Sequence, residues 1–339
     1  MRILVVSSYP PKHCGIASYA AQQVGALRRE GHEVRVMSVD GEGAVDYPLR
    51  LTDPSDAENA ISIFAGFDRV ILHYSPGNLA SGRDTREVFH GALHRACKSL
   101  PTTRFEVLIH EMDYPGGWRR RRRRARLWRS VTTLQFHTPH ERDQFSRHYP
   151  SVSRARLQIV EHGRSMRKFY HGSRADAQAE LGIEPDQIMF VSCGFIQESK
   201  GFDRVVSIFA DSTNLPPTAH YHVVGSARTP DSIPYRDQLT EAARRVPRVT
   251  LHDEYVDDES FDRWIVAADY IVAPYRTIWS SSLLARAALH DRPVIATDVG
   301  GLRDQARPDD TIVADDGELA GAIETLANRH RAKAPDSHR

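Results

Sequence analysis

The sequence has 339 residues, of which 40% are hydrophobic and 26% charged, and its formal net charge is +1. This composition is that of a soluble globular protein, and no apolar run approaches the ~18 residues that a membrane-spanning helix needs. The near-neutral charge argues against a protein that coats nucleic acid. Three widely spaced cysteines, Cys14, Cys97 and Cys193, suggest neither a disulfide framework nor a zinc site, which fits a reducing cytoplasm.

Short runs rich in Val and Ile alternate with helix-length segments along the whole chain. The N-terminal apolar run is too short for a secretory signal and is predicted as the first strand. Because hydrophobicity within the runs is continuous rather than alternating, we expect strands buried on both faces, as in a parallel sheet. The predicted strands are RILVVSS, HEVRVMSV, DRVILHY, FEVLIHE, TTLQFHT and LQIVEHG in the first half, and IMFVSCG, YHVVGSA, RVTLHDE, YIVAPY, PVIATDVGG and TIVADD in the second.

This strand–helix–strand pattern predicts two doubly wound α/β domains. A polar stretch over residues 164–185 leads into a fresh first strand, so we place an N-terminal domain at 1–165 and a C-terminal domain at 166–329, followed by a disordered tail at 330–339. Two parallel sheets in tandem imply a cleft between their facing strand ends, where ligands of such sheets bind. The loops after the strands are therefore the candidate functional segments.

Three of these loops carry groups suited to an anion. Gly15 begins a helix after the first strand, where backbone N–H groups can approach a phosphate, although such a turn also favours glycine for steric reasons. Lys200 stands at another helix start and suits a phosphate clamp, the alternative being a solvated lysine. Ser280, Ser281 and Ser282 can cap a third helix and leave N–H donors directed outward.

The histidines and acids give no metal site. None of the 17 histidines shows H-E-x-x-H or comparable spacing. His137 and His140 are three apart at a predicted helix start, where capping and solvation are commoner than ligation. His110 ends a buried strand, and from the residues alone we interpret it as structural. We expect neither a metal nor a cofactor.

Together these stretches resemble the retaining, nucleotide-sugar-dependent glycosyltransferases of the GT-B fold, specifically family 4. The resemblance covers about residues 1–315, through SSYPPKHCGIASYAAQQVGALRREGHEV, VEHGRSMRKF, VSCGFIQESKGFDRVV, HYHVVGSA and DRPVIATDVGGLRDQ in the family's order. It implies two Rossmann-like domains facing across a cleft. It also implies sugar transfer from a nucleoside-diphosphate sugar to an unknown acceptor, with retention and with stabilisation of the leaving diphosphate. The first domain is the family's acceptor-binding half.

The resemblance also implies roles for single residues. Lys200 would bind the diphosphate as the glycosidic bond breaks, and His110 would lie near the donor sugar; these are the predicted catalytic residues. No Asp-x-Asp clamp follows a strand, which disfavours the metal-dependent GT-A style of transfer. The predicted donor-binding residues are Gly15, Gly194, Tyr255, Val256, Trp279, Ser280, Ser281 and Ser282, with Tyr255 and Val256 at the nucleobase.

The chain departs from the family at three donor-site positions. Phe195 stands where the family has an arginine, and Thr277 and Ala285 stand where it has two glutamates. Loss of a charge-assisted hydrogen bond costs about 1.5–3 kcal/mol, so we expect a weakened site. Arg276 or Arg286 is the predicted replacement for the missing positive charge, and no replacement for the ribose carboxylate is evident.

These departures keep other functions open. The first alternative is a catalytically degenerate GT-B protein that binds a sugar nucleotide or a partner without turnover. A nucleotide-sugar epimerase fits the order of the motifs less well. A nucleic-acid binder is disfavoured because no recognised binding module accompanies the basic residues.

The stretch GGWRRRRRRARLWRS carries eight arginines on the predicted acceptor-side domain. As a helix it places Trp118 and Trp128 on a narrow apolar stripe, among arginines that include Arg119, Arg122 and Arg126. This pattern suits an anionic membrane surface, an anionic acceptor, or simply a solvated face. We expect a cytoplasmic protein, peripheral at the inner face of the membrane if the first interpretation holds.

Overall fold

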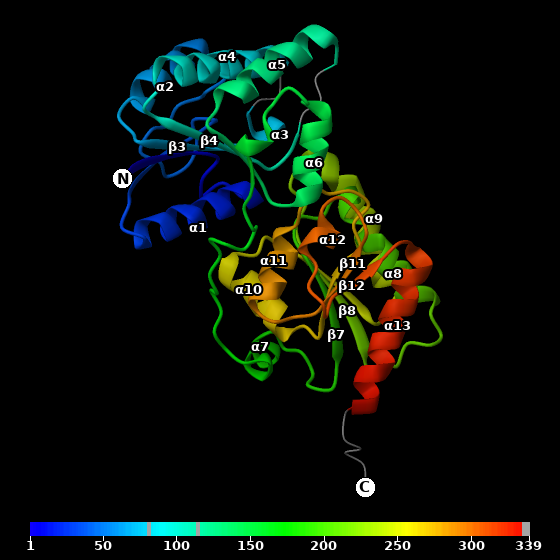
Figure 1. Cartoon of the computed structure of the whole chain (residues 1–339). Helices are drawn as coiled ribbons and strands as arrows, with labels where there is room; N and C mark the ends of the chain where they lie inside the picture. The colour runs from blue at the N-terminus through cyan, green and yellow to red at the C-terminus, as the bar shows by residue number, and fades with distance from the viewer. Residues whose placement is uncertain (80–82, 113–115, 334–339) are drawn as a thin grey trace. The chain divides into compact units, whose positions relative to one another are not determined.

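The chain folds into two compact units, Met1–Met166 and Arg167–Arg339, in a computed structural model that describes residues 1–79, 83–112 and 116–333. Each unit is built on a parallel sheet of six strands with helices packed on it (Figure 1). Each apolar run predicted as a strand forms one. The predicted α/β class with two doubly wound sheets is therefore confirmed.

The sheet of the N-terminal unit has the order β2-β1-β3-β4-β5-β6, and all of its strand pairs are parallel. Figure 1 shows α1 on one face of this sheet and α2, α4 and α5 on the other, which is why most strand residues are buried. The strands are β1 (Arg2–Val6), β2 (Glu33–Met37), β3 (Arg69–Tyr74), β4 (Arg104–Ile109), β5 (Thr133–Phe136) and β6 (Leu157–Ile159). The helices are α1 (Gly15–Arg29), α2 (Pro54–Phe64), α3 (Pro76–Leu79), α4 (Arg83–Ser99), α5 (Trp118–Ser130), α6 (Pro139–His148) and the 3-10 helix η1 (Arg154–Arg156).

The sheet of the C-terminal unit has the order β12-β11-β10-β7-β8-β9 and is also parallel. Its strands are β7 (Ile188–Cys193), β8 (Ala219–Gly225), β9 (Val249–Asp253), β10 (Tyr270–Ala273), β11 (Val294–Thr297) and β12 (Thr311–Val313). Its helices are α7 (Arg174–Glu180), α8 (Phe202–Asp211), α9 (Ile233–Arg244), α10 (Asp258–Ala267), α11 (Ser282–Leu289), α12 (Leu302–Gln305) and α13 (Asp316–Lys333), with the 3-10 helices η2 (Glu198–Lys200) and η3 (Pro230–Ser232). β7 is central and buried along its whole length.

The arginine-rich helix α5 differs from its prediction at one end. Trp118 is 67% exposed, whereas Trp128 is fully buried and packs edge-on against Tyr74 at 5.2 Å between ring centroids. The predicted stripe that joins the two tryptophans on one surface is therefore wrong. Trp128 lies on the buried face of α5 with Ala125 and Leu127, whereas Trp118 is the first residue of the helix and lies outside that face.

Of the tail predicted at 330–339, residues 330–333 belong to α13, and residues 334–339 lie outside the described part of the chain. Among the described helices, none is long and apolar enough to cross a membrane. Within 1–79, 83–112 and 116–333, no group of three or more His, Cys, Asp or Glu side chains has the arrangement that holds a metal ion.

Candidate functional site

The strand order of the C-terminal unit indicates where a ligand binds. β7 and β10 are neighbours, but the chain leaves β7 towards β8 on one side and leaves β10 towards β11 on the other. In open parallel sheets, ligands bind outside the carboxyl ends of two such strands because their loops diverge there. Residues 194–201 and 274–281 are these loops, and they carry half of the predicted donor-binding residues, namely Gly194, Trp279, Ser280 and Ser281.

Backbone segments of these loops touch directly at two glycines. Gly201 has φ +63°, and a Cβ at that position would lie 2.2 Å from the carbonyl oxygen of Pro274. Gly300, in the loop after β11, has φ +57°, and a Cβ there would lie 1.9 Å from the carbonyl oxygen of Ile278. Only a residue without a side chain fits both the dihedral angle and the contact. The loop after β10 is thereby held between the loops after β7 and β11.

Lys200 lies at this junction, as the last residue of η2 and directly before Gly201. Its Nζ is 4.0 Å from the centroid of the Tyr275 ring, a cation–π contact that links the loops after β7 and β10. It forms no ion pair with any carboxylate of the described residues. The switch point therefore holds a positive charge that no described carboxylate neutralises.

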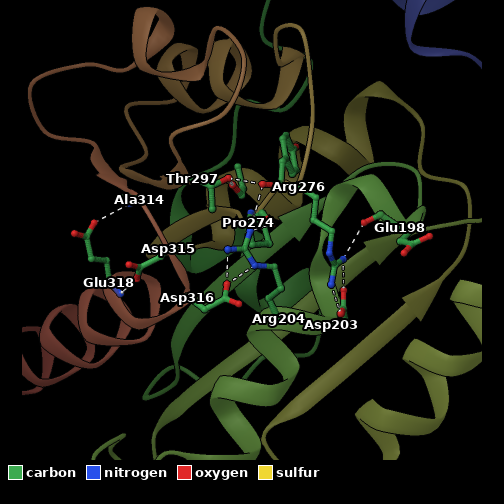
Figure 2. Close-up of polar contacts among 12 residues, drawn as sticks. Glu198, Asp203, Arg204, Pro274, Arg276, Thr297, Ala314, Asp315, Asp316 and Glu318 are labelled. Carbon is green, nitrogen blue, oxygen red and sulfur yellow. Dashed lines mark hydrogen bonds and ion pairs between the residues drawn. The ribbon is translucent and has the colours of Figure 1, made fainter.

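Arg276 pairs with a carboxylate of the protein, so it is not the predicted replacement for the missing positive charge of the donor site. Figure 2 shows its guanidinium paired with both carboxylate oxygens of Asp203, at 2.8 and 2.6 Å, and donating to the carbonyl of Glu198 at 2.9 Å. Burial raises the pKa of Asp203, but the bonds from Arg276 and Tyr235 outweigh this effect, so its pKa lies below the ordinary value. Arg276 is committed to holding the loop after β10 against α8.

A second arginine anchors the same loop. Arg204 donates from Nη1 to the carbonyls of Pro274 and Tyr275, at 2.9 and 3.3 Å, and pairs with Asp316 at the start of α13 (Figure 2). Thr297, the last residue of β11, donates to the carbonyl of Tyr275 at 2.7 Å. Two segments distant in sequence, α8 and β11, therefore fix the backbone on which Tyr275 presents its ring to Lys200.

Helix α11 begins within the serine segment, but the side chain of its N-cap residue does not cap it. Ser281 is the N-cap residue and its hydroxyl makes no capping bond. Instead its N–H donates to Oε1 of Gln305 at 2.7 Å, while Nε2 of Gln305 donates to the Ser281 carbonyl at 3.1 Å. The prediction that the serines cap the helix is thus wrong for Ser281, and its N–H is already used. Trp279 and Ser280 are half-buried, and Ser282 is exposed at the first position of the helix.

Arg286, the other predicted charge replacement, points away from the loops into the packing between α10 and α11. Its guanidinium is 4% exposed, bonds Asp258 at 2.7 Å and lies 3.2 Å from Asp262. The rings of Phe169 and Phe261 each lie 5.3 Å from it. This prediction is also wrong, because an arginine that is buried and paired in this way is part of the fold.

The structure instead places a different cation beside the position that lacks its arginine. Phe195 follows Gly194 at the end of β7, and the guanidinium carbon of Arg228 lies 5.7 Å from the centroid of its ring. Arg228 is exposed in the loop after β8. Three residues earlier, at the end of β8, Gly225 lies against the backbone of Gly194, since a Cβ there would lie 1.9 Å from the Gly194 carbonyl oxygen. Sequence reasoning missed Arg228, although its place after a strand was the available signal.

The predicted nucleobase residues follow β9, the edge strand of the sheet. Tyr255 is 45% exposed, an unusual state for so large a ring, and Val256 packs against the core of the unit. Tyr255 therefore offers an accessible aromatic surface, and Val256 anchors the loop that carries Tyr255.

Gly15 and His110 belong to the N-terminal unit. Gly15 is the first residue of α1, and an added Cβ would meet nothing within 4 Å, so the fold has no steric need for glycine there. His110 directly follows β4 and packs among Tyr19, His73 and His137, with ring centroids 5.1–5.4 Å away. Burial, followed by the charges of neighbouring imidazoles, holds the pKa of His110 well below its ordinary value, so the ring is neutral.

Comparison with known proteins places this geometry in a family. Residues 186–329 match the family described as Glycosyl transferases group 1. The D-inositol 3-phosphate glycosyltransferase of Rhodococcus jostii is 28% identical over 204 residues, which cover 58% of this chain and 44% of that protein. Its counterpart in Paenarthrobacter aurescens is 22% identical over 77% of this chain and 64% of that protein. The match spans less than half of the Rhodococcus protein.

Solved structures show a similar arrangement of the whole chain. Sucrose-phosphate synthase of Thermosynechococcus elongatus has a TM-score of 0.69 at 17% identity and covers 98% of this chain and 90% of its own. Anabaena HepE in complex with UDP-glucose has a TM-score of 0.71 at 15% identity, covering 98% and 91%. The chain therefore has the GT-B fold, and its residues 186–329 match the group 1 glycosyltransferases. The resemblance drawn from the sequence motifs is thereby confirmed, and the group 1 domain contains Lys200 and the loops around it.

We expect Gly201→Ala to lower the free energy of unfolding by about 1–3 kcal/mol, because alanine at a positive φ is strained and its Cβ would displace the Pro274 carbonyl. Urea denaturation followed by circular dichroism measures this change. Gly321→Ala is the matched control: it lies within α13, an added Cβ meets nothing within 4 Å, and alanine there should stabilise by up to ~1 kcal/mol. Equal effects of the two substitutions would contradict the role assigned to Gly201.

Proposed function

We propose that the chain transfers a sugar from a nucleoside-diphosphate sugar to an acceptor with retention at the anomeric carbon. The observation that carries the proposal is Lys200, an unneutralised ammonium fixed over the Tyr275 ring at the switch point of a group 1 glycosyltransferase domain. Solved neighbours support the donor class, since Anabaena HepE holds UDP-glucose and Arabidopsis starch synthase IV holds ADP and acarbose. Retention rests on the resemblance to family 4.

The catalytic effect is electrostatic. Negative charge develops on the leaving diphosphate as the glycosidic bond breaks, and a preorganised cation lowers the energy of that state because it does not have to reorganise. Lys200 is held for this role by Tyr275, whose backbone is fixed by Arg204 and Thr297. The leaving diphosphate then assists deprotonation of the acceptor hydroxyl on the same face, so this scheme needs no separate enzymic base.

Arg228 supplies the second positive charge of the donor site in this proposal. Phe195 replaces the arginine that the family has at that position, and Arg228 reaches over the Phe195 ring from the loop after β8. An arginine binds phosphate through two parallel N–H bonds, which a lysine cannot do. The site therefore keeps a lysine–arginine pair, with the arginine supplied by a different loop.

Lys200→Ala should lower kcat/KM for nucleotide-sugar turnover about ten- to a hundred-fold, the equivalent of one charge-assisted contact of about 1.5–3 kcal/mol. A panel of nucleotide sugars, assayed for release of nucleoside diphosphate with cell-extract acceptors, provides the measurement. Arg245→Ala removes an exposed cation at the end of α9 and should leave the rate unchanged. Donor binding without turnover of any donor would instead support the degenerate, non-catalytic alternative.

Arg228→Ala should weaken binding of the nucleoside diphosphate about ten-fold or more for the same electrostatic reason. Isothermal titration calorimetry with UDP and ADP measures the effect. Adding Phe195→Arg to the Arg228→Ala variant returns a guanidinium to the same place and should restore most of the affinity. Unchanged affinity in Arg228→Ala, or no recovery in the double variant, would remove Arg228 from the site.

We also propose that α5 docks the protein on an anionic membrane surface. Arg119, Arg122 and Arg126 recur at helical spacing, are exposed, and pair with no carboxylate of the described residues. Burial and then the nearby charges of Lys98 and Arg126 lower the pKa of His94, which is consistent with an uncompensated cationic surface. Trp118, exposed at the start of this helix, suits the headgroup region of a bilayer.

Replacement of Arg119, Arg122 and Arg126 by glutamine should reduce binding to vesicles that contain phosphatidylglycerol, by about 1 kcal/mol for each arginine. Sedimentation at low and high salt measures the loss, with phosphatidylcholine vesicles as the uncharged comparison. Glutamine at Arg244, Arg245 and Arg329, three exposed arginines of the C-terminal unit, is the charge-matched control. Equal losses in both triple variants, or binding that salt does not weaken, would refute docking through α5.

A further inference from the structure

Four imidazoles line the carboxyl edge of the N-terminal sheet. His73 lies on β3, and His110, His137 and His162 lie just beyond the ends of β4, β5 and β6, which are successive neighbours in the sheet. All four surround the ring of Tyr19 on α1, with ring centroids 5.3–5.6 Å from it. His137 and His162 stack on one another at 4.0 Å.

A chain of hydrogen bonds determines which nitrogen of His110 carries its proton. Nε2 of His73 lies 2.9 Å from Oε1 of Gln23, a carbonyl oxygen that only accepts, so this nitrogen is the donor. A neutral imidazole has one N–H, so Nδ1 of His73 has a lone pair and accepts from Nε2 of His110 at 3.2 Å. His110 is therefore the Nε2–H tautomer, with an unprotonated Nδ1.

The argument requires both rings to be neutral. Burial, and then the charge of His137, lowers the pKa of His73 to about 3. Burial and the neighbouring imidazoles act on His110 in the same direction. A proton on either ring would place a charge among aromatic rings and other imidazoles, where water does not compensate it.

His137 presents a second lone pair. Its Nδ1 lies 3.0 Å from the carbonyl oxygen of Val160 and donates to it, so Nε2 is the unprotonated nitrogen. This Nε2 is buried and has no hydrogen-bond partner, and the same is true of the Tyr19 hydroxyl. His137 itself is 4% exposed. Most buried polar atoms of folded proteins have a hydrogen-bond partner, so an unpartnered nitrogen beside His110 and Tyr19 is a candidate contact for a ligand.

We propose that Gln23 and His73 are positioning residues that hold His110 in its Nε2–H tautomer, and that Nδ1 of His110 and Nε2 of His137 form an uncharged pair of acceptors for ligand hydroxyl groups. The ring centroids of His110 and His137 are 5.4 Å apart, so one small ligand spans both. Two lone pairs without positive charge bind hydroxyl donors and disfavour a phosphate group. The ligand class is thus a polyol or sugar; its identity as a substrate rests on the proposed transferase function.

The first test reads the tautomers directly, without any activity. Ring-¹⁵N histidine spectra of the full chain, assigned with His73→Gln and His110→Gln, should show an unprotonated Nδ1 in His110 that does not titrate between pH 5.5 and 8. Gln23→Met removes the acceptor at similar volume and should give mixed tautomers at His73 and His110. Gln22→Met, one residue earlier on α1, should leave both unchanged. An Nδ1–H form of His110, or its ordinary titration, would overturn the proposal.

The second test supplies hydroxyl groups as myo-inositol or glucose and compares them with inorganic phosphate. The polyols should shift the signals of His110 Nδ1 and His137 Nε2, and phosphate should not. Shifts from phosphate alone, or from none of the three, would refute the hydroxyl site. Repeating the titration in Lys200→Ala separates the two proposals, because that variant should slow transfer while leaving the histidine signals and their polyol response intact.

Discussion

The donor side of this protein depends on how closely three loops approach one another at the carboxyl edge of the C-terminal sheet. At Gly201 and Gly300 the backbone of one loop meets the carbonyl oxygen of another at distances that leave no room for a Cβ. This contact fixes the loop after β10, and through it the ring of Tyr275 and the ammonium of Lys200. The chemistry assigned to Lys200 is thus a consequence of backbone packing, because a preorganised charge stabilises a developing anion better than a mobile one.

The structure also separates the cations that are paired with carboxylates from those that we assign to the donor site. Arg276 and Arg286 both lie next to positions that the family uses for the donor, and both are neutralised by carboxylates, Arg276 by Asp203 and Arg286 mainly by Asp258. Among the described residues, Lys200 pairs with no carboxylate and lies over an aromatic ring, and Arg228 lies over Phe195. Residue type alone does not distinguish Lys200 from Arg276 and Arg286, since the difference lies in which groups of other elements surround each side chain.

The two units present opposite chemistry at the carboxyl ends of their strands. The C-terminal unit places the ammonium of Lys200 there, whereas the N-terminal unit presents neutral imidazoles whose pKa values are lowered by burial. The two environments suit different chemical groups, because a cation attracts a phosphate and the lone pair of a neutral imidazole accepts from a hydroxyl group.

Hydrophobic pattern was sufficient to predict the strands, because a strand buried on both faces must be apolar throughout and needs no knowledge of its neighbours. The spacing of motifs was likewise sufficient to recognise the resemblance to the family and to locate the loops that hold Lys200 and His110. The partners of individual side chains came only from the tertiary structure. Trp128 faces the core, Gln305 satisfies Ser281, and Arg228 reaches Phe195 from a loop 33 residues away in sequence, as the residue numbers show. Local sequence sets the period of burial along an element. The pairing of charged side chains depends on contacts between segments far apart in the chain, and only the folded chain brings those segments together.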